Sequence, residues 1–253
     1  MSGPAHHPVF LHGFAGSSES WGEALVDGLV VAGMAPVLVD LPGHGREAVR
    51  TATGGITLDA TVEIIAEAGV WPTDLVGYSL GARVALHFAA AHPQRVRRLV
   101  LESGSPGLAT PDERAARRGA DAALAARIVD EGIETFVAYW ESQSIFETQA
   151  GLPPEARARQ RAIRLGNDPS SLAEALRSLG TGALPSLWEE LPRIATPTLL
   201  LVGARDRKFV DIAQRMASGM ADARVVIVPD AGHSVHLERP AAWVEAVANF
   251  LAE

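Results

Sequence analysis

A serine in a Gly-x-Ser-x-Gly pattern is the first group in this chain that could do covalent or acid–base chemistry. Gly77, Ser79 and Gly81 form the pattern. The apolar run before it, residues 73–77, predicts a buried strand, and the Ala- and Leu-rich run 82–91 predicts a helix. Strand, sharp turn and helix make a nucleophile elbow, which presents the serine hydroxyl at a helix N-terminus. Ser79 is therefore the candidate nucleophile or base.

An acid and a histidine follow Ser79 in the order that a serine triad needs. Asp206 comes directly after an apolar run that predicts a strand, and His233 follows the last predicted strand. The chain order Ser, Asp, His belongs to α/β-hydrolases. Asp206 could instead cap the helix after it, and Glu102 at another strand end is a competing acid. Asp230 is too near His233 in sequence to orient it well, and suits a turn.

Two backbone N–H groups are candidates for an oxyanion hole. A His-Gly-aromatic loop at residues 12–14 follows the first predicted strand, and it can present the N–H of Phe14. Together with the N–H of Leu80, it would hold a developing negative charge. His12 in this loop and His44 after the second predicted strand are interpreted as structural, hydrogen-bonding histidines.

Arginine dominates the basic residues of the chain. Lys208 is the only lysine among 22 basic residues, a bias that genomic base composition accounts for. Position is more informative than number. Arg83 lies four residues after Ser79 and shares its helix face, so it indicates an anionic substrate. Several further arginines cluster between Arg114 and Arg164.

Composition bounds the class of protein. The chain has 253 residues, 47% hydrophobic and 21% charged, which is ordinary for a globular α/β domain with an insertion. It has no cysteine, which excludes disulfides and thiolate chemistry, and its net charge of -8 argues against nucleic-acid binding. No apolar run approaches ~18 residues and no signal-like region precedes the first strand. We expect a cytoplasmic monomer without membrane contact. We expect neither a cofactor nor a metal, even though His233 and His236 are close in sequence.

Strand and helix patterns alternate along the chain. The predicted strands are 8–11, 36–40, 74–77, 98–102, 198–202 and 224–228, and the helices around them are 21–32, 57–68, 82–91, 210–220 and 241–251. Apolar strands that alternate with helices predict a doubly wound, mostly parallel sheet covered on both faces, the α/β-hydrolase fold.

The alternation stops between residues 106 and 190. That stretch has helical periodicity over 113–129, 133–139, 154–165 and 170–179, and no convincing strand. We interpret it as an inserted helical cap. The predicted organisation is a core of residues 1–105, a cap of 106–190 and a second core segment of 191–253.

Taken together, the motifs resemble one branch of the α/β-hydrolase superfamily over nearly the whole chain. That branch is the 2-succinyl-6-hydroxy-2,4-cyclohexadiene-1-carboxylate synthases of menaquinone (vitamin K2) biosynthesis. The resemblance is carried by Phe10–Gly16, Val39–Gly45, Val76–Arg83, Glu102–Leu108, Gly203–Phe209 and Ala231–His233. Two departures are visible: Ala82 stands where a glycine is common, and the cap sequence is divergent.

The resemblance implies a lyase on a hydrolase scaffold. Such an enzyme eliminates pyruvate from 2-succinyl-5-enolpyruvyl-6-hydroxy-3-cyclohexene-1-carboxylate, a small polycarboxylate. It implies that Ser79, activated by His233, removes a ring proton, while Phe14 and Leu80 hold the oxyanion and Asp206 orients the histidine. No covalent acyl-enzyme is required.

The resemblance also implies a set of substrate-binding residues. Arg83, Arg117 and Arg164 would clamp the three carboxylates, and Tyr78 and Trp140 would line the pocket. Arginine suits this task because its guanidinium binds carboxylate bidentately. Alternatively, Arg117 and Arg164 belong to a solvated helix surface with i,i+4 partners, and Trp140 belongs to the core of the cap.

A triad alone does not separate elimination from hydrolysis. The alternative function is a serine hydrolase that acts on a carboxylic ester, a thioester or a C–C bond of a small anionic substrate. A binding protein on this fold is a third class, against which the complete triad argues. The arginines favour the lyase, since an ordinary esterase has no need of three cations.

Overall fold

Six parallel strands form the centre of the protein, whose computed structural model describes residues 6–45 and 55–253. The strands are β1 (Val9–Leu11), β2 (Val37–Val39), β3 (Thr73–Tyr78), β4 (Val96–Glu102), β5 (Thr198–Gly203) and β6 (Ala223–Val228). Their order is β2-β1-β3-β4-β5-β6, and each neighbouring pair of these strands is parallel. The predicted doubly wound sheet is confirmed, and each predicted strand is found with its ends shifted by only a few residues.

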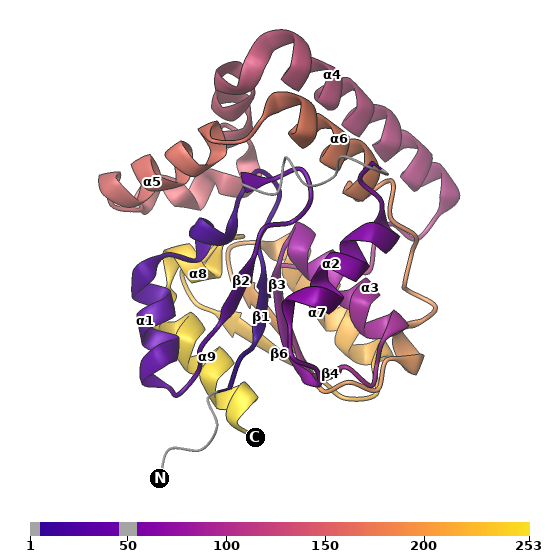
Figure 1. Ribbon diagram of the computed structural model, residues 1–253, viewed down its shortest axis with the longest axis vertical. Helices are drawn as coiled ribbons and strands as arrows, with labels where there is room; N and C mark the ends of the chain where they lie inside the picture. Colours follow the sequence, from indigo (N-terminus) through magenta and orange to yellow (C-terminus); the bar gives the residue numbers. More distant parts are fainter. Residues whose placement is uncertain (1–5, 46–54) are drawn as a thin grey trace.

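Helices cover both faces of the sheet (Figure 1). Successive strand residues point to opposite faces, so Val9 and Leu75 pack on one side while Phe10 and Val76 pack on the other. The first side carries α2 (Leu58–Ala68), α3 (Leu80–Ala91) and α7 (Arg207–Gly219). The second side carries α1 (Glu23–Val31), α8 (Val235–Glu238) and α9 (Pro240–Ala252). Two buried cores therefore hold the sheet rigidly between them.

The first predicted helix, 21–32, is divided in the structure. A 3₁₀ turn, η1 (Ser18–Trp21), comes first, and α1 begins only at Glu23. Gly22 separates the two with a φ of 71°, a conformation that glycine adopts without strain. Hydrophobic spacing cannot reveal this break, because Trp21 and α1 bury their apolar side chains in the same core.

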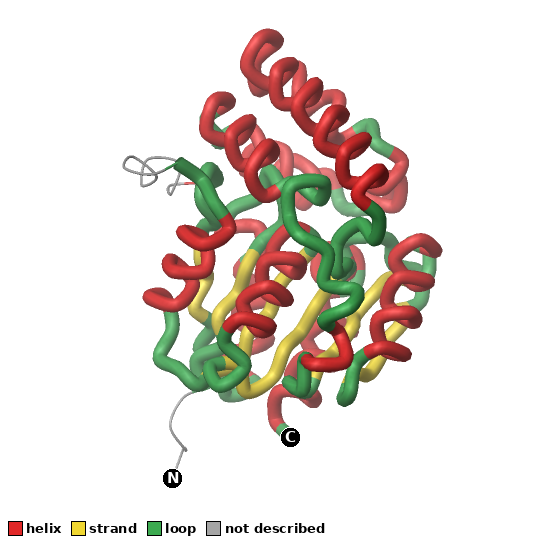
Figure 2. Tube along the Cα trace, turned by 90° about the vertical axis from the view of Figure 1, so that its right-hand side faces the viewer, coloured by secondary structure: helices red, strands yellow, loops and turns green. Residues whose placement is uncertain are grey.

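The helical insertion lies between β4 and β5, beyond one end of the strands (Figure 2). It comprises α4 (Pro111–Glu141), the 3₁₀ segment η3 (Ser144–Gly151), α5 (Pro154–Leu165) and α6 (Pro169–Leu179), with the short η4 (Leu191–Arg193) before β5. The predicted gap between 113–129 and 133–139 corresponds to Gly132, whose φ of 83° and ψ of 169° kink α4. The η3 segment was not predicted.

The division into core 1–105, cap 106–190 and core 191–253 stays a prediction. Residues 1–5 and 46–54 of the first segment lie outside the described residues. What the structure does give is a place for a site. The chain passes from β1 outward to β2 and then returns to β3 on the other side of β1. In such sheets ligands bind beyond the carboxyl ends of the strands at this switch point.

Candidate active site

Ser79 stands at the switch point, in the turn between β3 and α3. Its backbone has φ 51° and ψ -103°, a strained conformation for a residue other than glycine. The turn is held by the Ser79 N–H, which donates to the Glu102 carbonyl at 2.9 Å. A Cβ on Gly81 would collide with the carbonyl oxygen of Leu11, and one on Gly77 would lie 2.5 Å from the Gly81 carbonyl oxygen. Both glycines are therefore needed for the close approach of helix and strand.

The structure brings Ser79, His233 and Asp206 into one hydrogen-bonded chain. His233 Nε2 lies 3.0 Å from Ser79 Oγ, and His233 Nδ1 lies 2.7 Å from Asp206 Oδ2. The histidine side chain is only 2% exposed, so its ring has little freedom. The acid follows β5 and the histidine follows β6, which places all three groups at the carboxyl ends of parallel strands. This geometry suits proton transfer between serine and histidine.

Asp206 takes both of the roles that its sequence position suggests. Oδ1 accepts a hydrogen bond from the Phe209 N–H at 3.3 Å and caps α7, while Oδ2 is left for His233. The Phe209 ring packs edge-on against the His233 ring, with centroids 4.6 Å apart. Helix capping therefore fixes the carboxylate that orients the histidine.

The two competing acids do not bond to His233. Glu102 is completely buried, and its carboxylate accepts hydrogen bonds from His236 Nδ1 at 2.8 Å and Trp243 Nε1 at 2.8 Å. Asp230 is exposed in a turn with φ 54°. Asp206 is therefore the acid that faces the candidate base.

The N–H groups of Phe14 and Leu80 flank Ser79, one from the loop after β1 and one from the start of α3. Both residues line the same cavity as Ser79 and His233. Among the described residues, neither N–H donates to a protein acceptor, whereas the next one, Gly81 N–H, donates to the His12 carbonyl at 3.0 Å. Two undirected donors beside a nucleophile are what an oxyanion hole requires.

His12 and His44 support the loop after β1 that carries Phe14. His12 Nε2 accepts from the Leu41 N–H at 2.9 Å, so Nδ1 carries the hydrogen and donates to the Gly13 carbonyl at 2.8 Å. Burial lowers the pKa of both histidines, that of His44 to about 3. Both rings are therefore neutral and fully buried, which agrees with a structural role and leaves them unsuited to act as bases.

The cavity over Ser79 has a volume of about 170 Å³ and combines apolar walls with three cations. The cations are Arg83, Arg117 and Lys208. Arg83 is half-buried, and its Nε has no hydrogen-bond partner in the described part of the chain. Burial, reinforced by the nearby Arg117, lowers its pKa to about 10 against the opposing effect of Asp121, so it still carries a charge at neutral pH. Arg83 therefore offers this cavity a charged donor that suits an anionic ligand.

Arg117 uses one of its donors for a partner within the protein. Its Nε donates to Asp121 Oδ1 at 2.8 Å, one turn further along α4. Thus the i,i+4 pairing and the position in the cavity are both observed. The rest of the guanidinium is free to turn to a ligand, since the side chain is 43% exposed.

Arg164 lies on the other side of Ser79. It lines a second, smaller cavity of about 40 Å³ with Tyr78 and Ser79, and not the cavity of Arg83. The aromatic side chains of Phe14, Trp140 and Phe146 border both cavities. The three arginines thus do not gather at one point but stand on two sides of the serine.

Tyr78 and Trp140 both face the site. Burial raises the pKa of the Tyr78 phenol, which is therefore neutral, and its hydroxyl lies 2.6 Å from Ser234 Oγ. Trp140 lines both cavities and also contacts Phe14 and Phe136, with ring centroids 5.4 Å and 5.7 Å away. It is at once a wall of both cavities and part of the apolar packing of the helical insertion.

Lys208 is the cation that sequence reasoning missed as a site residue. It stands two positions after Asp206, on the first turn of α7, and is exposed at the cavity. Its ammonium lies 5.6 Å from the centroid of the Phe209 ring. The available signal was that the only lysine of the chain adjoins the candidate acid.

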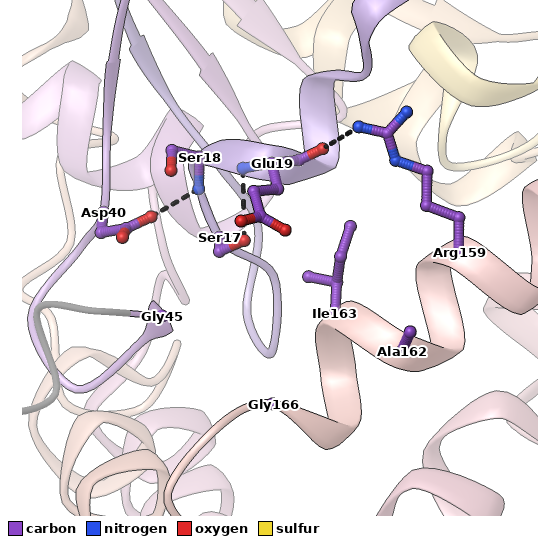
Figure 3. Close-up of a pocket in the computed structure, with 9 residues that line it drawn as sticks. All are labelled: Ser17, Ser18, Glu19, Asp40, Gly45, Arg159, Ala162, Ile163 and Gly166. Carbon is purple, nitrogen blue, oxygen red and sulfur yellow. Dashed lines mark hydrogen bonds between the residues drawn. The ribbon is translucent and has the colours of Figure 1, made fainter.

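A larger cavity, about 480 Å³, lies between η1 and α5, with residues of both elements in its lining (Figure 3). There Arg159 donates to the Glu19 carbonyl at 3.2 Å and Asp40 accepts from the Ser18 N–H. The Arg159 bond ties α5 of the helical insertion to η1. Neither Ser79 nor His233 borders this cavity, so size does not identify the candidate site; the convergence of Ser79, His233 and cations does.

Within residues 6–45 and 55–253, each helix is too short or too polar to cross a lipid bilayer. In the same residues, no three His, Cys, Asp or Glu side chains are grouped as metal ligands would be.

Comparison with known proteins gives a consistent picture. The model of the alpha/beta hydrolase family matches residues 9–247. A Bacillus subtilis (strain 168) protein, provisionally named 2-succinyl-6-hydroxy-2,4-cyclohexadiene-1-carboxylate synthase, is 40% identical over 96% of this chain and 89% of its own length. The synthase of that name from Klebsiella pneumoniae is 35% identical over 96% of this chain and 93% of its own. The structure of MenH from S. aureus matches with a TM-score of 0.92 and 33% identity, covering 99% of this chain and 94% of that one.

Proposed function

The chain belongs to the alpha/beta hydrolase family and, within it, to the 2-succinyl-6-hydroxy-2,4-cyclohexadiene-1-carboxylate synthases, and on that premise we propose how its residues carry out the elimination of pyruvate. The substrate is 2-succinyl-5-enolpyruvyl-6-hydroxy-3-cyclohexene-1-carboxylate. Its conversion to the product removes a proton from the ring carbon that bears the succinyl group and breaks the C–O bond to the enolpyruvyl group. The enzyme is thus a carbon–oxygen lyase of menaquinone biosynthesis.

Proton abstraction falls to Ser79. His233 Nε2, 3.0 Å from Ser79 Oγ, takes the hydroxyl proton as the serine oxygen takes the ring proton. The electron pair of the C–H bond moves into the succinyl carbonyl and makes an enolate. Its oxygen is held by the N–H groups of Phe14 and Leu80. Asp206 stabilises the protonated His233 through the 2.7 Å contact at Nδ1.

Elimination completes the reaction without a covalent intermediate. As the enolate collapses and its carbonyl re-forms, a double bond forms between ring carbons 2 and 3, the double bond between carbons 3 and 4 moves to carbons 4 and 5, and the C–O bond from carbon 5 to the enolpyruvyl group breaks. The electron pair leaves with the oxygen as the enolate of pyruvate. That enolate takes back the proton that the Ser79–His233 pair carries, and pyruvate and the diene are the products. Every proton and electron pair is accounted for by groups of the chain and the substrate.

The cations on either side of Ser79 support a polycarboxylate substrate. Arg83 carries this part of the proposal, because it is a half-buried guanidinium whose Nε has no hydrogen-bond partner among the described residues, in a cavity shared with Ser79. Arg117 lies with it, and Arg164 stands in the second cavity. Carboxylates spaced around a ring would reach both sides of the serine. The proposal also takes residues 106–190 as a cap that closes over the ring.

Two broader expectations go with this activity. We keep the cytoplasmic location and the monomeric state as predictions, and the small polycarboxylate is the only partner that we propose. Size-exclusion chromatography with light scattering tests the oligomeric state directly.

One assay tests the reaction class. Purified protein is given the enolpyruvyl substrate, and pyruvate release is followed with lactate dehydrogenase and NADH, with short p-nitrophenyl esters in parallel. Pyruvate release that depends on Ser79 supports the lyase. Ester turnover without pyruvate release would overturn it in favour of a hydrolase. Ser79→Ala removes the base and tests the site under either chemistry.

A further inference from the structure

A chain of buried hydrogen bonds joins the cap to the residues that flank the triad. Tyr78 immediately precedes Ser79, and Ser234 immediately follows His233. Their side chains meet, with Tyr78 Oη 2.6 Å from Ser234 Oγ. The residues next to Ser79 and His233 are thus hydrogen-bonded to one another, on the side of Ser79 where the second cavity lies.

Gln149 of η3 extends this chain to Arg164. Gln149 Nε2 donates to Ser234 Oγ at 2.9 Å, and Gln149 Oε1 accepts from Arg164 Nη2 at 3.3 Å. The other end of the guanidinium is bonded to Glu141 Oε1 at 3.0 Å. Ser234 is 1% exposed, and Gln149 and Arg164 are each 8% exposed. Buried polar groups of this kind are costly unless each finds its partner.

Hydrogen-bond chemistry fixes the direction of the chain. A guanidinium only donates, so the carbonyl end of the Gln149 amide must face Arg164 and the NH₂ end must face Ser234. Ser234 Oγ therefore accepts from Gln149. Its own hydrogen has one remaining oxygen partner among the described residues, which is Tyr78 Oη. Since Ser234 donates to Tyr78, the phenol hydrogen is left free.

We propose that Gln149 is a positioning residue that aims the Tyr78 hydroxyl hydrogen into the cavity beside Ser79. Arg164, Gln149 and Ser234 each donate to the next, and each bond polarises the one after it. Tyr78 thereby offers a strengthened neutral donor to a substrate oxygen on the Arg164 side. The inference rests on the proposed function, because it assigns this donor to the same substrate.

The Gln149→Glu variant reverses the chain with little change of shape. The new carboxylate oxygen accepts from Ser234, so Ser234 no longer donates to Tyr78, and Tyr78 must donate to Ser234 instead. We expect kcat/KM for pyruvate release to fall about 10- to 100-fold, the range for losing one buried hydrogen bond. Gln149→Met, which leaves the Ser234 hydrogen for Tyr78, should lose less. Gln214→Glu, the same change on the exposed surface of α7, should lose less than twofold and serves as control.

A double-mutant cycle separates positioning from mere folding. In the Tyr78→Phe background no phenol hydrogen remains, so Gln149→Glu should lower kcat/KM by less than twofold further. An equal loss in both backgrounds, or no loss from Gln149→Glu alone, would overturn the inference. Thermal unfolding of every variant identifies any that fail to fold. Absence of pyruvate release by the unaltered enzyme would instead contradict the proposed function, so the two failures are distinguishable.

Discussion

At the scale of single residues, the candidate site contains a cation and two N–H donors that are available to a negatively charged ligand. The Nε of Arg83 has no hydrogen-bond partner, and the N–H groups of Phe14 and Leu80 have no protein acceptor, among the described residues. Asp206, in contrast, is fully used, with one oxygen on α7 and one on His233. The uncommitted groups are those that a substrate must satisfy, and the committed ones hold the machinery in place.

Arg83→Ala tests the uncommitted cation. Removal of a partly buried partner of a substrate carboxylate should raise the barrier by about 2–5 kcal/mol, measured as kcat/KM for pyruvate release. Arg83→Lys should recover part of this loss, because charge is kept while the bidentate fork is lost. Arg127→Ala is a matched control, since Arg127 forms an exposed pair with Glu131. An Arg83→Ala enzyme with unaltered kcat/KM would refute the anion clamp.

Lys208 at the cavity mouth should act at longer range. The chain carries a net charge of -8, so a polyanionic substrate meets general repulsion that a local cation relieves. Lys208→Gln is expected to raise KM severalfold with kcat nearly unchanged, and to weaken the dependence of kcat/KM on salt. Arg207→Gln removes a neighbouring charge that does not border the cavity. Equal effects from both variants would show that general charge, and not the position of Lys208, matters.

At the scale of elements, η3 is the part of the insertion that touches the triad. Phe146 packs edge-on to the His233 ring at 6.3 Å, and Gln149 bonds to Ser234. Thr148 lies so close to Gly232 that a Cβ on that glycine would collide with its hydroxyl. The loop that carries His233 therefore packs closely against η3.

Gly232→Ala should therefore disturb both cap docking and catalysis. Overpacking at such a contact costs about 1–3 kcal/mol, which predicts a lower melting temperature and a lower kcat/KM. The nearest atoms are all in Thr148, so Thr148→Ala in the same chain should restore much of both. If the double variant is no better than Gly232→Ala, the contact does not set the position of the loop.

At the scale of the whole molecule, the sequence was sufficient for whatever depends on local pattern. The elbow at Ser79, the six strands and the order of Asp206 and His233 could all be predicted, because each leaves a motif or a periodicity. The η3 segment could not, since residues 144–151 have no helical period and their role comes from contacts with distant loops. Nor could the separation of Arg164 from Arg83, because it depends on how the helices of the cap pack on one another and on the core.

Buried histidines make the unfolding free energy of the protein depend on pH. Burial lowers the pKa of His12, of His44 to about 3 and of His87 to about 4, all below the unfolded value near 6.5. Between these values the unfolded chain binds protons that the native protein does not. The contribution of these histidines to the unfolding free energy should therefore be complete above pH ~6.5 and fall as the pH drops, by about 1.4 kcal/mol per pH unit for each such histidine.

His87→Gln isolates one of these groups. Urea unfolding between pH ~4 and ~6.5 should show a shallower decline for the variant than for the unaltered protein, and parallel lines above that range. A difference between the two proteins that does not change with pH would mean that His87 contributes through packing alone.

Phe14 has a consequence for how such enzymes diverge. Its N–H is a candidate oxyanion donor, while its ring contacts Phe136 and Trp140 of the insertion at 6.1 Å and 5.4 Å. One residue thus joins the candidate oxyanion hole to the helical insertion. A graft that replaces the insertion would therefore also change the contacts that position the proposed oxyanion donor. Under the proposed mechanism, a lineage that exchanges the insertion for a new substrate must also keep Phe14 in place.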